Sequence, residues 1–153
     1  MRDIYRGCEQ FIKEKGMALP LFIIWSREYE TGISILDEQH RGLVSIINSF
    51  YFHREDADGD LSKALIPTAE MFKAYVKINF LTIEKLMEVS EYPEIEEYRA
   101  LHKKTLNHII VMDSQYRKAR DAHGLLGFLK RYWLKTVHDN RKQYLPHLLK
   151  YYE

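Results

Sequence analysis

Apolar residues recur at steps of three and four positions along most of this 153-residue chain, the spacing that places side chains on one face of an α-helix. Four segments carry the pattern, at about residues 35–52, 61–89, 94–122 and 125–143. Their connections are short, and the first is the polar loop HREDADGD. Short connections make consecutive helices antiparallel neighbours. The pattern therefore predicts an all-α, up-down-up-down antiparallel four-helix bundle.

Proline and glycine set the expected ends of these helices. Pro93 should break the second helix, and Gly124 should end the third, as a C-terminal glycine does. Pro146 should interrupt the chain after the fourth helix, which leaves HLLKYYE as a short tail.

Two further pieces are predicted ahead of the bundle. Residues 3–15 place four apolar side chains on one face, which predicts a short extra helix, and an extended arm should follow it. We divide the chain into an N-terminal helix and linker, residues 1–22, and a four-helix domain, residues 23–153. The extra helix either packs on the bundle or docks on a partner protein, and both interpretations stay open.

Each predicted helix also carries a polar residue near the middle of its apolar stripe. In an antiparallel bundle these mid-helix positions meet at one level, so they should form a buried polar layer. An unpaired buried polar group costs about 1 to 3 kcal/mol, so the members should bond to one another or to water. They are His40, Asn79, Tyr98, His102 and Thr136. Inward-facing histidines on neighbouring helices can begin a metal site, although a structural histidine is the commoner case.

Three stretches carry a resemblance to a known family. They are IWSREYETGISILDEQHRGLVSIIN, FLTIEKLMEVSEYPEIEEYRALH and LLGFLKRYWLKTVHDNRKQYLPHL. The first has a Trp, an acidic Tyr-containing segment and then Leu-Asp-Glu-Gln-His, and in this it strongly resembles the opening of bacterial hemerythrins. The other two resemble later blocks of that family, so the resemblance spans about residues 23–150. It implies a four-helix protein related to carriers that bind dioxygen reversibly at a non-haem di-iron centre.

Carried over position by position, most of the family's seven iron ligands have no counterpart here. His40 and His102 match ligand histidines of the first and third helices. The substituted ligand positions are Asn79, Tyr98 and Thr136 in place of histidines, Ile83 in place of a bridging Glu, and Arg141 in place of a bridging Asp. Glu84 matches a neighbouring surface acid and should point away from the stripe. His138 should lie on the wrong face of its helix.

These substitutions predict that the di-iron centre is lost. Bridging carboxylates neutralise part of the charge of two ferrous ions, whereas Ile83 offers no lone pair and Arg141 adds a permanent positive charge if it points inward. We therefore expect no cofactor, with non-haem iron as the alternative. A single metal ion bound by His40, His102 and Tyr98 also stays open.

Composition adds little to this picture. The net charge of +1 gives no reason to expect nucleic acid or an anionic membrane as a partner. The single cysteine, Cys8, excludes an intrachain disulfide and a cysteine metal cluster. The N-terminus is too charged for a signal peptide and no apolar run is long enough for a membrane span, so we expect a cytoplasmic protein.

The resemblance and the lost ligands together predict a hemerythrin-like protein with a degenerate metal site. We expect it to act as a protein-binding, scaffold or signalling-associated module, through its N-terminal helix, its bundle surface or self-association. The Tyr-rich end could serve the same role or simply pack the bundle. The alternatives are residual metal or dioxygen binding and a small-ligand sensor. No nucleophile–base–acid set, phosphate loop or nucleotide fingerprint is present in the sequence, so we do not expect an enzyme.

Overall fold

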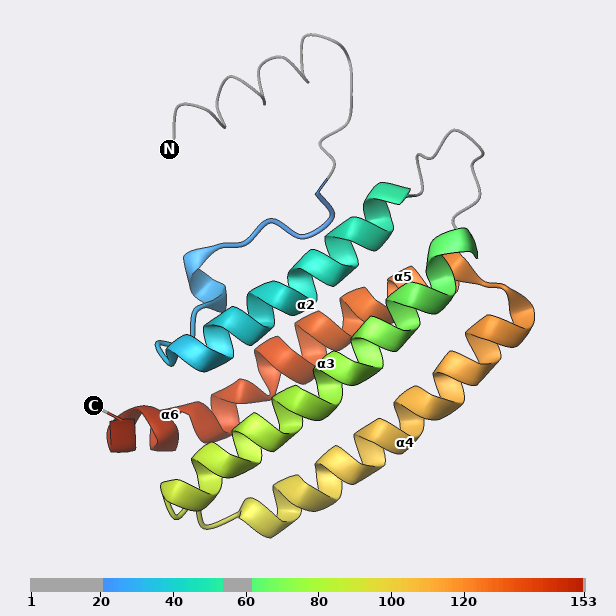
Figure 1. Cartoon of the computed structure of the whole chain (residues 1–153). Coiled ribbons are helices and arrows are strands. Elements are labelled where there is room, and N and C mark those ends of the chain that lie inside the picture. Colours follow the sequence, from blue (N-terminus) through green and yellow to red (C-terminus); the bar gives the residue numbers. More distant parts are fainter. Residues whose placement is uncertain (1–20, 54–61, 153) are drawn as a thin grey trace, which may run out of the picture.

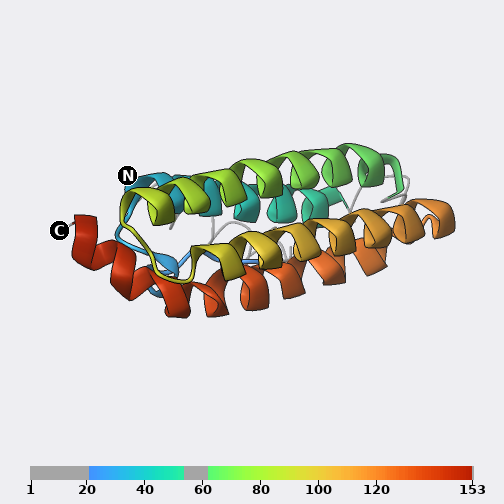
Figure 2. The same cartoon turned by 90° about the horizontal axis from the view of Figure 1, so that it is seen from below.

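The computed structural model describes residues 21–53 and 62–152, and this part of the chain is helical with no strand. In chain order the elements are the 3₁₀ turn η1 (Arg27–Tyr29), α2 (Ser34–Phe52), α3 (Ser62–Val89), α4 (Ile95–Ala119), α5 (Ala122–Arg131), the π-helical segment η3 (Tyr132–Asp139) and α6 (Arg141–Tyr152). Consecutive long helices run in opposite directions, and α5, η3 and α6 follow one another as a fourth rod (Figure 1). Seen from below, the rods share one long axis (Figure 2). The predicted all-α bundle is confirmed.

The junction between α4 and α5 differs from the prediction. Helix α4 ends at Ala119, and Arg120 then adopts a left-handed conformation with φ of 50°. Asp121 caps α5 because its side chain accepts a hydrogen bond of 2.8 Å from the Gly124 N–H. Gly124 therefore lies in the first turn of α5, and its predicted role as the end of the third helix is wrong.

Pro146 does not interrupt the chain. Helix α6 runs through it to Tyr152, although a proline inside a helix removes a backbone hydrogen bond at a cost of about 3 kcal/mol. Tertiary contacts offset that cost. Tyr144 and Leu148 are buried, and the His147 ring lies 2.8 Å from the Ser90 carbonyl oxygen.

The core consists of two apolar clusters, one toward each end of the bundle. The larger one gathers side chains such as Phe72, Leu129 and Trp133. The smaller one includes Leu36 and Met87. His40 lies in α2 between Leu36 of the smaller cluster and Leu43 of the larger one, and Asn79 lies in α3 between Val76 of the larger cluster and Ile83 of the smaller one. The predicted polar layer therefore lies close to the boundary between the two clusters.

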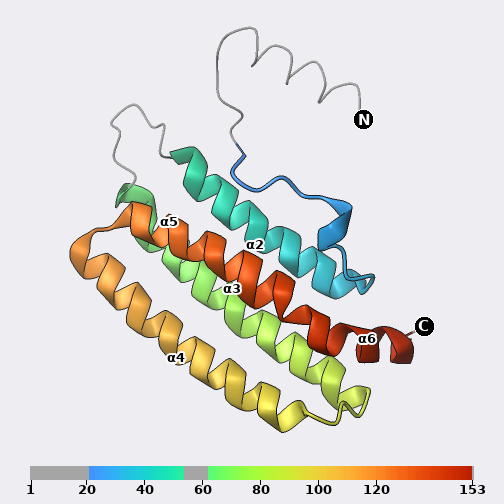
Figure 3. The same ribbon diagram turned by 180° about the vertical axis from the view of Figure 1, so that it is seen from behind.

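Residues 21–30, which include η1, form an arm that lies beside α2, visible from behind in Figure 3. The Asn48 amide holds it by accepting hydrogen bonds from the Phe22 and Ile23 N–H groups and donating one to the Ile23 carbonyl, at 2.8 to 2.9 Å. The predicted extra helix at residues 3–15 lies outside the described residues, and the domain boundary stays a prediction. Within residues 21–53 and 62–152, no helix combines the length and apolar character that crossing a membrane requires.

Candidate functional site

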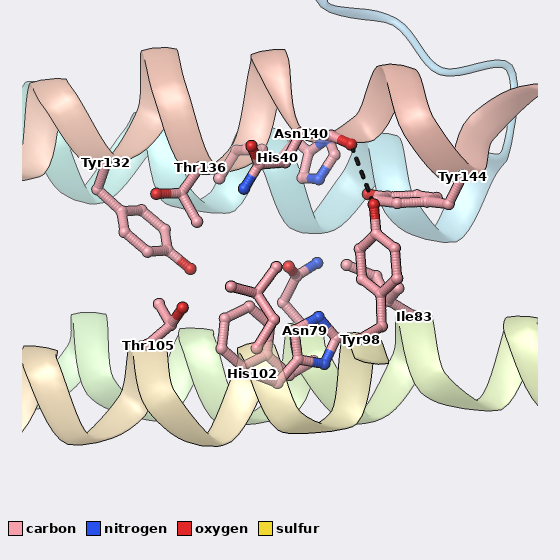
Figure 4. A pocket seen from close by; sticks show the side chains of 13 residues that line it. His40, Asn79, Ile83, Tyr98, His102, Thr105, Tyr132, Thr136, Asn140 and Tyr144 are labelled. Atoms are coloured by element: carbon pink, nitrogen blue, oxygen red, sulfur yellow. Dashed lines mark hydrogen bonds between the residues drawn. The ribbon is translucent and has the colours of Figure 1, made fainter. Parts of the chain in front are cut away.

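A small enclosed cavity lies between the two apolar clusters (Figure 4). Its volume is about 20 Å³, measured as the space open to the centre of a water molecule, which is enough for a single water. All five predicted polar residues line it, together with Ile83. The other lining residues are Phe80, Leu101, Thr105, Tyr132, Val137, Asn140 and Tyr144. Mid-helix positions of the four rods thus meet at one level, as the sequence pattern predicted.

The cavity residues of the fourth rod were only partly predicted. Tyr132 and Tyr144 both line the cavity. They are 12 positions apart, a separation that would leave them about 120° apart around a regular α-helix. The wider turns of η3 rotate less per residue, which brings both residues to one face. The 3.6-residue template placed Asn140, and Tyr132 or Trp133, on the inner stripe of this segment with Thr136, but because it cannot represent a π segment it did not place Tyr144 there.

His40 faces the cavity from α2 and has no exposed surface. Neither of its ring nitrogens has a hydrogen-bond partner, and the ring meets Trp133 edge to face at 5.8 Å. Burial and, to a smaller extent, the positive charge of Arg141 lower the pKa of His40 to about 4, and the negative charge of Asp37 partly opposes them. The imidazole is therefore neutral at pH 7.

Asn79 and Tyr98 form hydrogen bonds, but not within the polar layer. The Asn79 side-chain amide donates to Gln39 Oε1 at 2.9 Å. The Tyr98 hydroxyl donates to Gln143 Oε1 at 3.1 Å, with the Asn140 carbonyl as a longer acceptor at 3.4 Å. Burial raises the pKa of Tyr98 to about 12, so its hydroxyl keeps its proton. The expected bonds among the layer residues are not formed, because the long side chains of Gln39 and Gln143, on other helices, offer acceptors that short-range periodicity does not reveal.

His102 has a carboxylate partner. Its Nδ1 lies 2.7 Å from Glu84 Oε1, and its ring stacks on Phe80 with centroids 3.9 Å apart. Burial lowers the pKa of His102 and outweighs the opposing effect of Glu84. A neutral ring donates its Nδ1–H to Glu84. The expectation that Glu84 points away was therefore wrong, because its side chain is long enough to reach the adjacent α4.

Arg141 is buried but does not enter the cavity. Only 7% of its surface is exposed, and its guanidinium donates to the backbone carbonyls of Glu28 and Tyr29 in the arm. His138 lies outside the cavity lining, as expected, with its ring edge to face with Tyr29 at 5.3 Å. The fourth rod therefore turns both side chains toward the arm.

The described residues contain no group of three or more His, Cys, Asp or Glu side chains placed to hold a metal ion. Two histidines, His40 and His102, line the cavity, and the Glu84 carboxylate contacts His102 from beside it. The other polar groups of its wall are amide, phenol and hydroxyl groups.

Comparison with known proteins shows distant similarity to bacteriohemerythrins. The one from Pseudomonas aeruginosa is 24% identical over 125 residues, which cover 80% of this chain and 79% of the relative. Those from Pseudomonas paraeruginosa and Stenotrophomonas maltophilia are 22% and 21% identical, over 80% and 73% of this chain and 79% and 71% of the relatives. No family model matches, and no solved structure gives a significant match. The helical bundle and these similarities together support a distant relationship between this chain and the hemerythrin family.

Proposed function

We propose that this protein is a hemerythrin-like bundle that no longer holds a di-iron centre, does not carry oxygen, and acts as a protein-binding or signalling-associated module. One observation carries the proposal: no Asp or Glu side chain lines the cavity in which the ligand positions meet. At the two positions that the resemblance assigns to bridging carboxylates, Ile83 packs in an apolar cluster and Arg141 is a buried cation.

The donor set does not fit a pair of iron ions. Two ferrous ions bring four positive charges, which a dry site must neutralise. The cavity wall offers neutral imidazole, amide, phenol and hydroxyl groups. The Glu84 carboxylate, which lies beside the cavity residue His102, already accepts a hydrogen bond from that ring and could supply only one negative charge. The Asp37 carboxylate, which acts electrostatically on His40, is bonded to Thr31. The balance of charge therefore opposes binding of both ions.

The positive charge of Arg141 adds to this shortage of negative charge at the cavity. Its positive charge is one of the causes that lower the pKa of His40, so it disfavours a proton on that ring. A metal cation at His40 would meet the same repulsion, with twice the charge. Arg141 thus opposes the use of His40 as an iron ligand, even though the guanidinium itself points to the arm.

The small size of the cavity favours a function on the surface of the protein. A space of about 20 Å³ admits one water molecule and no organic substrate, so the proposal includes no catalysis in the bundle interior. A bundle with a filled core can still present helix faces to other proteins. We therefore assign the function to surface recognition.

Metal analysis tests the loss of the centre. Protein produced in iron-supplemented medium should contain far less than one iron atom per chain and show no oxygen-dependent visible band. A hemerythrin that keeps all seven ligand positions, prepared in parallel, provides the positive control. About two iron atoms per chain, with such a band, would overturn the proposal.

The protein-binding role needs a separate experiment. The full chain and a variant that lacks residues 1–16 are used for affinity purification from the native cell. A partner lost with the truncation assigns recognition to the N-terminal segment, and a partner retained assigns it to the bundle surface. The absence of any specific partner for both proteins contradicts the role.

Residual metal or dioxygen binding is the second candidate. It is favoured by the unpartnered ring nitrogens of His40, which lies with His102 on the wall of one cavity. Saturable binding of one ion per chain that disappears in His40→Ala would support this candidate. It would also distinguish a single-metal site from the lost di-iron centre.

A further inference from the structure

A groove runs over the bundle surface between α4 and the fourth rod, directly outside the cavity. These two elements lie side by side in Figure 2, and α4 packs more extensively on α3 than on the fourth rod. The groove has a volume of about 460 Å³ and is open to solvent. Leu101, Thr105, Tyr132 and Thr136 form part of both walls, so one layer of side chains separates the groove from the cavity.

The groove has an apolar floor. Leu101, Ile109 and Met112 of α4 contribute to it, and Phe128 of α5 faces them. Leu101 leaves 40% of its surface exposed. The distance along α4 from Leu101 to Met112 is about 16 Å, which is three turns of helix. The floor is therefore as long as the contact face of a short helix.

Positively charged and basic side chains border this floor on both sides. Lys104 and His108 lie on the α4 side, and Arg131 and Lys135 lie on the other. Within the described part of the chain, Lys104, Arg131 and Lys135 form no ion pair, whereas Lys73 and Arg117 outside the groove both pair with Glu70 and Asp113. The sequence has no Asp or Glu from residue 98 to 112 or from residue 122 to 138. The groove is thus a local excess of unneutralised positive charge.

We propose that this groove docks an acidic amphipathic helix of a partner protein, with an apolar stripe on the floor and carboxylates along both flanks. The arrangement of the charges favours this occupant over a fatty acid. A fatty acid has a single carboxylate and needs cations at one end of the groove, whereas here the cations lie along both sides. The proposal rests on the protein-binding role proposed above, and it names the surface and the class of partner.

A synthetic peptide tests the groove. The probe is a fluorescent helix of about 16 residues with leucines on one face and glutamates on both flanks, compared with the same peptide carrying lysines in place of the glutamates. Fluorescence anisotropy should show saturable binding of the acidic peptide only. The charge reversals R131E and K135E together should weaken binding by about tenfold or more, because each replaces an attraction with a repulsion.

The matched control is the double variant K77E/K118E. Both of these lysines are exposed and lie outside the groove, so the variant changes the net charge by the same amount. It should change the dissociation constant by less than about twofold. Circular dichroism checks that both double variants keep the wild-type helix content.

Several results would overturn the assignment. They are equal binding of the lysine peptide, no binding of the acidic peptide, or an equal loss in K77E/K118E. Binding of phosphatidylglycerol vesicles without binding of the acidic peptide would instead indicate a membrane surface, and a concentration-dependent dimer that R131E/K135E abolishes would indicate self-association. A native partner that co-purifies equally with wild type and R131E/K135E rejects the groove and leaves the protein-binding role standing.

Discussion

His40 shows how a histidine is accommodated in the interior of the bundle. The ring is fully buried, it packs against Trp133, and its pKa is lowered to about 4. A charged imidazolium in that position would be desolvated and would face the positive charge of Arg141. The neutral ring suits its apolar neighbours, so the native structure depends on this residue staying unprotonated.

This dependence predicts an acid-sensitive fold. Between about pH 6.5 and pH 4 the unfolded chain binds a proton at His40 that the native protein does not, so the free energy of unfolding falls as the pH falls through that range. The full shift corresponds to about 3 kcal/mol. The lowered pKa of His102 acts in the same direction.

Urea unfolding of His40→Leu at pH 7 and pH 4.5 isolates the contribution of this residue. The variant should lose much less stability on acidification than wild type. His123→Leu, which removes an exposed histidine, should behave like wild type. An equal loss in wild type and His40→Leu would show that burial of His40 does not carry the effect.

At the scale of elements, one side chain of α2 bonds the backbone at the start of the arm. Asn48 provides both acceptor and donor for the backbone at Phe22 and Ile23. The arm also supplies the carbonyls that satisfy Arg141, so it completes the environment of a buried cation. Release of the arm should therefore destabilise the packing of the fourth rod as well as that of α2.

Asn48→Ala should lower the free energy of unfolding by about 2 kcal/mol, because it leaves the arm's backbone groups without partners. Trypsin should also cleave faster after Arg27, which lies on the arm. Ser45→Ala removes an exposed hydroxyl of α2 and should cost less than about 0.5 kcal/mol. Equal stability of Asn48→Ala and Ser45→Ala would mean that the arm does not depend on this contact.

The elements also show what the sequence could and could not predict. Apolar periodicity predicted four rods and the level at which their polar residues meet, because both follow from 3.6 residues per turn. It did not predict that α6 continues through Pro146, since that depends on burial of Tyr144 and Leu148. It also missed the π segment, and with it the place of Tyr144 on the cavity wall.

The electrostatic partners within the site were the least predictable feature. The pairing of Glu84 with His102 depends on the reach of a long side chain between two helices. The carbonyl partners of Arg141 lie 112 and 113 positions away in the sequence. A helical pattern reports which face a residue lies on, and it carries no information about such distant acceptors.

At the scale of the whole molecule, apolar packing can hold the bundle together without a metal. An apolar cluster lies on each side of the cavity, and between them they include side chains from all four rods. Metal binding is required for folding where the core is too small to be stable alone, which is not the case for these clusters. The proposed loss of the di-iron centre is therefore compatible with a stable fold.

Anaerobic titration of the purified protein with ferrous iron, followed by admission of oxygen, tests the central claim most directly. The account predicts no saturable binding of two ions per chain and no new visible band, because the cavity lacks the negative charge that would hold the ions together. Tight binding of about two ferrous ions per chain, with a band that depends reversibly on oxygen, would contradict it.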